Sequence, residues 1–473
     1  MAEKTIFEFQ LLKLLFIELS TMNKFLIGLM SCGIALSTAV EVGGWSSELG
    51  GQTRESGVPR LEAGVGRTES GRPYTEPGIV TGAERLDQYL PRLQGKRVAV
   101  FANHTSVIGN KNLVDVLKEK GVNITVIFGP EHGFRGTADA GEKIGNYTDA
   151  QTGIPVVSLY GSKHRPSAED LSVADVLLFD IQDVGTRFYT YISSMQEYME
   201  AAIENNKPLI ILDRPNPNGF YVDGPVLDTA FRSFVGMQPI PIVYGLTIGE
   251  YAYLLAGEGW LRQKVTAPIN IASSPERAAM ERRRAPTSPK AFSLTIIPCL
   301  NYTHKSKYVL PVKPSPNLPD IQSIYWYAST CFFEGTVLSE GRGTNKPFQV
   351  FGHPTLPKNL VSFTPRSMPG ATNPKLKDQL CYGWDLSGQP EEVLSKVNNR
   401  VQIKYLLEAY RQFPVKDSFF LNKGNFFNKL AGNNVLMQQV KEGKTEAEIR
   451  ESWEPGLRKF KEIRKKYLIY EDF

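Results

Sequence analysis

Short apolar runs alternate with longer amphipathic segments along the chain from about residue 78. Four of the runs have the length of a buried strand and lie at residues 97–102, 124–128, 175–179 and 208–212. In the segments between them, apolar residues recur every three or four positions, which is the period of a helix that buries one face. This alternation predicts an α/β fold with a doubly wound parallel sheet and right-handed crossovers.

Further elements follow from the same pattern. Helices are predicted at 113–120 and 191–206, and another is predicted to begin at Thr247, whose hydroxyl suits an N-cap. The chain beyond residue 290 is less regular and predicts a second, smaller α+β domain. The remaining predicted elements are strands at 155–159 and 294–297 and helices at 323–331, 391–413 and 445–467.

The N-terminal residues have the pattern of an export signal. Met22-Asn23-Lys24 precede an apolar stretch at 25–36, and small residues follow up to Ala39. We therefore expect residues 1–39 to be a leader that directs the protein to the periplasm, with Met22 as the true start. The alternative is an uncleaved leader that anchors the protein to the membrane.

Changes in composition predict the domain boundaries. Residues 40–77 are rich in Gly, Ser, Glu and Arg without periodicity, which is typical of a spacer. The charged, proline-containing stretch at 273–290 predicts a boundary. We expect a catalytic domain at 78–290 and a C-terminal domain at 291–473.

Polar side chains directly follow each of the four strands predicted at 97–102, 124–128, 175–179 and 208–212. Because parallel strands share one direction, these side chains converge at one edge of the sheet, where α/β proteins bind ligands. The four positions together predict an active site there. The candidates are Asn103, Glu131, His132, Arg135, Asp180, Asp183, Arg187, Tyr189, Tyr191, Asp213 and Asn216.

Glu131 is the strongest candidate for a general acid. It follows Phe128-Gly129-Pro130, where partial burial favours a protonated carboxyl group near neutral pH. His132 is placed to orient it or to contact substrate. The alternative is a turn in which Glu131 only caps the next segment.

The segment after the strand predicted at 175–179 offers several chemistries. Asp183 and Arg187 can pair, which would leave Tyr189 and Tyr191 to present flat faces to a sugar ring. Asp180 and Asp183 can instead bind a divalent cation, although neither nearby His has metal-ligand spacing. Asp213 and its neighbours in the proline-rich turn either contact ligand or lock the turn.

A later glycine-flanked segment carries two more candidates, Glu340 and Arg342. The guanidinium group is a natural clamp for a ligand carboxylate. The segment lacks the Walker A spacing, and no G-x-G-x-x-G follows the first strand, so no nucleotide cofactor is expected.

Composition and charge argue against some classes of ligand. The net charge is +5, but Lys and Arg are dispersed and the basic runs lack interleaved aromatic residues, which argues against nucleic acid. The four cysteines, one of them in the leader, have neither disulfide nor zinc spacing.

Taken in order, these blocks resemble the exo-β-N-acetylmuramidases of the NamZ type. The resemblance runs from about residue 78 to the C-terminus. It implies a Rossmann-like domain and a smaller C-terminal domain with the site in the cleft between them. It also implies release of N-acetylmuramic acid (MurNAc) from the non-reducing ends of peptidoglycan fragments. The blocks are GPEHGFRG (129–136), DIQDVGTRFYTY (180–191), DRPNP (213–217) and SEGRGT (339–344).

The resemblance also implies roles for particular residues. Glu131 becomes the acid, Glu340 and Arg342 lie across the cleft, and Arg342 or Arg187 binds the lactyl carboxylate of MurNAc. An N-acetyl sugar can supply its own nucleophile, in which case Asp180 or Asp183 would orient the acetamide. The expected partners are MurNAc–GlcNAc saccharides, with no metal, cofactor or protein partner.

Two other classes of function stay open from the sequence. A periplasmic protein that binds muropeptides or amino sugars would also use two α/β lobes around a cleft. A metal-dependent hydrolase would use Asp180, Asp183 and His132.

Overall fold

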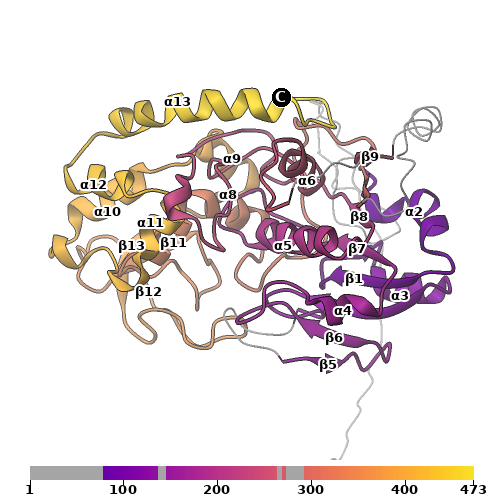
Figure 1. Cartoon of the computed structure of the whole chain (residues 1–473). Helices are drawn as coiled ribbons and strands as arrows, with labels where there is room; N and C mark the ends of the chain where they lie inside the picture. Colours follow the sequence, from indigo (N-terminus) through magenta and orange to yellow (C-terminus); the bar gives the residue numbers. More distant parts are fainter. Residues whose placement is uncertain (1–77, 137–144, 264–268, 273–291) are drawn as a thin grey trace, which may run out of the picture. The chain divides into compact units, whose positions relative to one another are not determined.

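The computed structural model describes residues 78–136, 145–263, 269–272 and 292–473. Their centre is an eight-stranded sheet in the order β5-β6-β4-β1-β7-β8-β10-β9 (Figure 1). All neighbouring strands are parallel except β5, which is antiparallel to β6. The predicted α/β class is therefore confirmed. The strands are β1 (Arg97–Ala102), β4 (Asn123–Gly129), β5 (Tyr147–Thr148), β6 (Pro155–Ser158), β7 (Val176–Asp180), β8 (Leu209–Leu212), β9 (Ile269–Ile271) and β10 (Leu294–Ile297).

The register of the central strands brings the predicted site segments to one edge. In β1, Phe101 pairs with Phe128 of β4 on one side and with Phe179 of β7 on the other. Ala102, the last residue of β1, pairs with Asp180, the last residue of β7. The segments that follow these strands therefore leave the sheet side by side.

Helices cover both faces of this sheet. Ala99 and Phe101 of β1 belong to a core shared with α5 (Tyr191–Glu204) and α6 (Ile248–Gly257). Their neighbours Val98 and Val100 belong to a second core, which contains side chains of α2 (Leu86–Leu93) and α3 (Leu113–Glu119). Successive residues of a strand point to opposite faces, so a strand that is apolar throughout needs a helical layer on each side.

The C-terminal part is a smaller α+β unit, as predicted. Its sheet has the order β11-β13-β12 and is antiparallel. Phe351 stacks between Phe333 and Trp384, with ring centroids 4.2 and 5.1 Å away. Its elements are β11 (Val350–His353), β12 (Val361–Phe363), β13 (Cys381–Asp385), α8 (Ile321–Thr330), α9 (Pro390–Val397), α10 (Lys404–Gln412), α11 (Phe426–Ala431), α12 (Val435–Lys441) and α13 (Glu446–Lys465).

Several short elements connect these layers. The described residues also contain a hairpin of β2 (Val107–Ile108) and β3 (Lys111–Asn112). The remaining helices are α4 (Ala168–Ser172), η2 (Gly82–Glu84), η3 (Thr229–Phe231), η4 (Cys331–Gly335), η5 (Lys416–Ser418) and η6 (Lys423–Asn425).

The single helix expected at 391–413 is wrong as one element. Asn398 and Asn399 adopt φ angles of 49° and 53°, which ends α9 before α10 begins. Asn tolerates this left-handed conformation better than most residues. The N-cap at Thr247 is confirmed, because its side chain accepts a hydrogen bond from the Glu250 backbone.

Some expectations concern residues outside the described ranges. These are the leader at 1–39, the spacer at 40–77 and the boundary stretch at 273–290. Strand β10 follows that stretch yet belongs to the eight-stranded sheet, so the sheet continues past residue 290. Across the residues with described positions, no helix combines the length and apolarity needed to cross a bilayer.

Candidate active site

A cavity of about 390 Å³ lies between the sheet edge and the C-terminal part. The loops after β4 and β7 form one side of its wall, and residues from the C-terminal part form the other. Of the candidates predicted from the sequence, five line it: Glu131, His132, Tyr189, Tyr191 and Arg342.

Glu131 is held in a tight turn directly after β4. The Gly133 N–H donates to Pro130 O at 3.0 Å, which closes the turn. His132 has a φ of 68°, an uncommon conformation for a residue other than glycine, and its Nε2 lies 3.3 Å from Ser315 Oγ. Tyr160, just after β6, donates a hydrogen bond of 2.9 Å to Glu131 Oε1. The turn therefore holds the backbone at Glu131, and Tyr160 fixes the direction of its carboxyl group.

Tyr189 and Tyr191 form an aromatic wall beside Glu131. Their rings meet edge to face with centroids 4.7 Å apart. Tyr189 donates to Pro314 O at 2.9 Å, and Asn103 Nδ2 donates to Tyr191 Oη at 3.0 Å. Asn103 itself is fully buried, so its observed contact with the site is through Tyr191.

Arg342 lies in the wall formed by the C-terminal part, between two carboxylates. Its Nη2 is 2.8 Å from Glu334 Oε1, and its Nη1 is 3.0 Å from Glu340 Oε1. The guanidinium group also lies over the Phe348 ring, 4.8 Å from the centroid. Three contacts thus hold the arginine in one orientation within the cavity wall.

Lys375 supports this arrangement from behind. Its Nζ lies 2.8 Å from Glu340 Oε2 and donates to the backbone carbonyls of Phe333 and Leu338 at 2.7 Å. Burial alone would raise the pKa of Glu340, but Lys375 and Arg342 together lower it below its usual range. Glu340 is therefore an anion that positions Arg342, and it does not line the cavity.

The two aspartates after β7 do not line the cavity. Asp180 accepts hydrogen bonds of 2.5 and 2.8 Å from the buried Arg214. Asp183 accepts hydrogen bonds from Tyr244 Oη and from the Gly185 N–H. Burial raises the pKa of Asp183 to about 6, although those two donors lower it. Both side chains face protein donors behind the cavity wall.

Arg187 does not form the ion pair with Asp183 that the sequence suggested. It is fully buried and donates to the carbonyls of Pro225, Ile240 and Leu430 at 2.8–2.9 Å. Burial lowers its pKa to about 9. The side chain therefore joins the loop after β7 to α11 and does not line the cavity.

Arg135 is also engaged elsewhere in the protein. It forms ion pairs with Asp115 at 3.0 Å and with Asp149 at 2.8 Å. These pairs connect the loop after β4 to α3 and to the residues after β5.

The proline-rich turn is locked by protein contacts. Asp213 accepts hydrogen bonds from Thr247 Oγ1 at 2.7 Å, the Gly249 N–H at 2.8 Å and Tyr470 Oη at 2.6 Å. Asn216 donates to Leu246 O at 2.8 Å. Neither side chain lines the cavity, so the structure favours the turn-locking alternative for both.

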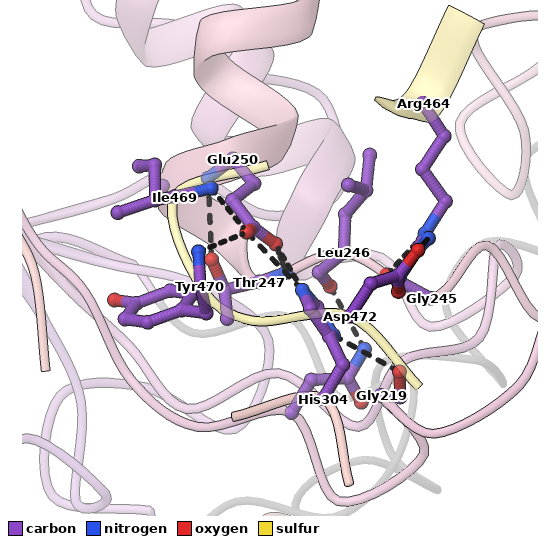
Figure 2. A network of polar contacts seen from close by, with 12 residues as sticks. Gly219, Gly245, Leu246, Thr247, Glu250, His304, Arg464, Ile469, Tyr470 and Asp472 are labelled. Carbon is purple, nitrogen blue, oxygen red and sulfur yellow. Dashed lines mark hydrogen bonds and ion pairs between the residues drawn. The ribbon is translucent and has the colours of Figure 1, made fainter. Parts of the chain in front are cut away.

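A buried network reinforces this turn (Figure 2). His304 Nε2 lies 3.0 Å from Glu250 Oε2, and its Nδ1 lies 3.0 Å from Gly219 O. Glu250 Oε1 accepts from the Ile469 N–H at 2.8 Å. His304 therefore ties α6 to the turn that follows β8, and the C-terminal Ile469 adds a further contact to α6.

Sequence reasoning missed several residues of the cavity wall. Tyr160 comes just after β6, so the strand-end argument would have found it if it had been applied to the predicted strand at 155–159. Glu334 follows no strand and lies in the short helix η4, which left no signal. The missed residues include Tyr160, His164, Phe188, Phe234, Ser315, Asn317, Tyr327, Glu334, Phe348 and Phe426.

The described part of the chain contains no preformed cluster of metal-binding side chains. No group of three His, Cys, Asp or Glu side chains lies close enough together there to hold an ion.

The fold and the cavity define a class of protein. It is an α/β protein whose site combines a tyrosine-held carboxyl group, an aromatic wall and a carboxylate-held arginine. This set suits an acidic sugar: aromatic rings pack against pyranose faces, a guanidinium binds a carboxylate, and a carboxyl group can transfer a proton.

Comparison with known proteins identifies the family. The model of the exo-β-N-acetylmuramidase NamZ N-terminal domain matches residues 98–322, and that of the C-terminal domain matches residues 325–470. The chain therefore belongs to the NamZ family, which confirms the resemblance seen in the sequence.

Individual relatives agree with this assignment. The peptidoglycan β-N-acetylmuramidase NamZ of Bacillus subtilis is 38% identical over 410 residues, which cover 84% of this chain and 92% of that protein. Two crystal structures of DUF1343 family proteins from Bacteroides fragilis are similar. One is 43% identical with a TM-score of 0.71 and covers 84% of this chain; the other is 29% identical with a TM-score of 0.64 and covers 83%. This chain covers 99% of each of them.

Proposed function

We propose that this protein is an exo-β-N-acetylmuramidase, a glycosidase that acts on saccharides derived from peptidoglycan. One observation carries the proposal: in a chain of this family, Glu131 and Arg342 line the same cavity. The carboxyl group supplies acid catalysis, and the arginine supplies recognition of an acidic sugar.

Glu131 acts as the general acid. It transfers a proton to the glycosidic oxygen as the bond to the anomeric carbon breaks, a contribution worth about 10²–10⁴-fold in rate. Tyr160 and the turn after β4 hold the carboxyl group in place for that transfer.

Arg342 selects the sugar. MurNAc differs from N-acetylglucosamine (GlcNAc) by a lactyl group that ends in a carboxylate. Glu334, Glu340 and Phe348 already hold Arg342 in place. Binding of this carboxylate therefore costs little additional side-chain conformational entropy. We infer that the substrate is a MurNAc–GlcNAc saccharide with MurNAc at its non-reducing end.

The direct test compares two chromogenic glycosides, β-MurNAc and β-GlcNAc, with wild type and Glu131→Gln. We expect cleavage of the MurNAc compound alone and its loss in the variant. Glu462→Gln, at a side chain that is 72% exposed, is the matched control and should keep full activity. A variant Glu131→Gln with wild-type rates would overturn the assignment of the acid.

The same experiment addresses the two alternative classes. A binding protein would bind MurNAc and cleave neither compound. A metal-dependent hydrolase would lose activity on prolonged incubation with EDTA, whereas the proposed mechanism keeps it.

Export belongs to the proposal as well. A positive region followed by an apolar stretch at 25–36 supports a leader and a periplasmic protein, with a membrane anchor as the alternative. Fractionation of cells, with N-terminal sequencing of the product, tests this directly. A mature chain that begins near residue 40 supports cleavage, and a full-length chain in the cytoplasm contradicts export.

A further inference from the structure

The cavity contains a carboxylate that the sequence did not suggest. Glu334 lines the cavity together with Glu131. The acidic residues considered from the sequence as a second catalytic group are Asp180, Asp183 and Glu340, and these are at most 5% exposed and absent from the cavity wall. Among the described residues, Glu334 is therefore the acidic partner that the cavity offers to Glu131.

The two carboxylates on Arg342 differ in their access to the cavity. The Glu334 side chain is 17% exposed, whereas that of Glu340 is 3% exposed. Glu340 is in addition paired with Lys375. Glu334 is thus the carboxylate on the cavity side of the guanidinium group, and Glu340 is the one behind it.

Tyr160 lines the cavity together with Glu334 and Glu131. Its hydroxyl donates to Glu131 Oε1 at 2.9 Å. Burial, and then the negative charges of Glu131 and of Glu334, raise the pKa of the Tyr160 phenol. Glu131, Tyr160 and Glu334 all line the same cavity, which agrees with the effect of both carboxylates on this phenol.

The ion pair with Arg342 restricts what Glu334 can do. Arg342 Nη2 lies 2.8 Å from Glu334 Oε1, so the guanidinium group occupies an oxygen that a base or a nucleophile would need. The same pair fixes the direction of the carboxylate, so it remains a well-oriented hydrogen-bond acceptor.

We propose that Glu334 is the second catalytic carboxylate and accepts the N–H of the substrate's 2-acetamido group while the acetamido oxygen attacks the anomeric carbon. This inference rests on the proposed function and deepens it. It replaces Asp180 and Asp183 as the group that orients the acetamide.

The reaction balances with these two residues and water. Glu131 gives its proton to the glycosidic oxygen as the C1–O bond breaks, and the acetamido oxygen donates its electron pair to C1. The resulting oxazolinium ion keeps its N–H on Glu334. Water then adds to C1, the C1–O bond to the acetamide breaks, and the Glu131 carboxylate takes the proton from water. Two successive displacements give a product that retains its anomeric configuration.

The first test compares Glu334→Gln with Glu131→Gln on aryl β-MurNAc glycosides whose leaving groups differ in acidity. We expect Glu334→Gln to lower kcat about 10²–10³-fold for every leaving group, as loss of a positioned electrostatic partner does. Glu131→Gln should recover much of its kcat/KM with the most acidic phenol, because the first step with that leaving group needs no proton, while kcat stays low because the water step still lacks its base. Wild-type kcat in Glu334→Gln would overturn the proposal.

A second measurement separates catalysis from folding. A MurNAc-derived thiazoline imitates the cyclic intermediate, and its affinity should fall at least tenfold in Glu334→Gln while the affinity for free MurNAc stays within about threefold. Equal affinity of the wild type and the variant for the thiazoline would count against the role given to Glu334.

The stereochemistry of the product provides an independent check. Proton NMR of the first product formed should show β-MurNAc. An α product would exclude participation of the acetamide and overturn the inference, while the proposed muramidase activity would stand. Absence of any MurNAc release by the wild type would instead overturn the proposed function itself.

Discussion

Tyr160 donates a hydrogen bond of 2.9 Å to Glu131 across the ends of two neighbouring strands. β6 and β4 are adjacent in the sheet, so the residues that follow them meet at its edge. The phenol holds Oε1 of the carboxyl group that we propose as the general acid.

Removal of this hydrogen bond should slow catalysis more than it weakens binding. Hydrogen bonds to charged groups contribute about 1.5–3 kcal/mol, so Tyr160→Phe should lower kcat about tenfold or more with little change in KM. Steady-state kinetics on the chromogenic MurNAc glycoside measures this. Tyr147→Phe, at a residue 37% exposed and outside the cavity lining, should leave kcat unchanged; a fall in both variants would contradict a specific role of Tyr160.

Arg342 should determine the preference for MurNAc. Lysine keeps the charge but lacks the planar fork that binds Glu334, Glu340 and a substrate carboxylate together. We expect Arg342→Lys to raise KM for the MurNAc glycoside about 10–100-fold, as loss of a charged hydrogen bond does. Arg366→Lys, at a side chain 72% exposed, is the control and should keep the wild-type KM. An unchanged preference of Arg342→Lys for the MurNAc over the GlcNAc glycoside would show that another group binds the lactyl carboxylate.

Lys375 should stabilise the fold as well as the site. Its replacement by Met leaves the buried Glu340 with one cation in place of two and removes the donor to the Phe333 and Leu338 carbonyls. Because the lysine is partly exposed, we expect a loss of about 2–3 kcal/mol in unfolding free energy, below the full cost of breaking a buried pair. Urea unfolding measures it, and Lys465→Met, at a side chain 61% exposed, should change stability by less than about 0.5 kcal/mol.

Asp183 should make stability depend on pH in a defined window. Its pKa is about 6 in the folded protein, above its ordinary value of 3.8, so the folded state binds more protons between these values. Stability from this group is therefore fully present below about pH 4 and is lost as the pH rises to 6. As the pH rises from about 4 to 6, the unfolding free energy of Asp183→Asn should increase relative to that of the wild type by up to about 3 kcal/mol. This is the free-energy equivalent of a difference of about two between the folded and unfolded pKa values.

Asp175 provides a control, because its contribution to stability should change with pH in the opposite direction. Arg97 lowers the pKa of the exposed Asp175 to about 2 through hydrogen bonds. Its contribution is present above the unfolded pKa and is lost as the pH falls towards 2. Unfolding measured from pH 2 to 8 should therefore show that Asp175→Asn becomes more stable relative to the wild type as the pH falls. If the unfolding free energies of Asp183→Asn and Asp175→Asn changed with pH in the same way, both pKa assignments would be contradicted.

The fold was predictable because its strands are apolar on both faces. Such runs, separated by helical periodicity, leave few alternatives to a parallel sheet with helices on each side. The break between α9 and α10 was missed, since Asn398 and Asn399 are compatible with a helix and only their left-handed conformation ends it.

The site was predictable where it follows a strand and, for Arg342, in a glycine-flanked segment. Glu131 and Tyr189 were found by that argument, whereas Glu334 and Phe426 reach the cavity from the C-terminal part through contacts distant in sequence. Polar residues behind a strand are also ambiguous. Asp180 and Arg187 looked equally functional in the sequence, yet their partners are a buried arginine and backbone carbonyls.

The most direct test of the central claim is incubation of the purified protein with a MurNAc–GlcNAc disaccharide, followed by mass spectrometry of the products. Wild type should release free MurNAc and GlcNAc, and Glu131→Gln should leave the disaccharide intact while Glu462→Gln cleaves it. An intact disaccharide with the wild type, or cleavage by Glu131→Gln at the wild-type rate, would contradict the account.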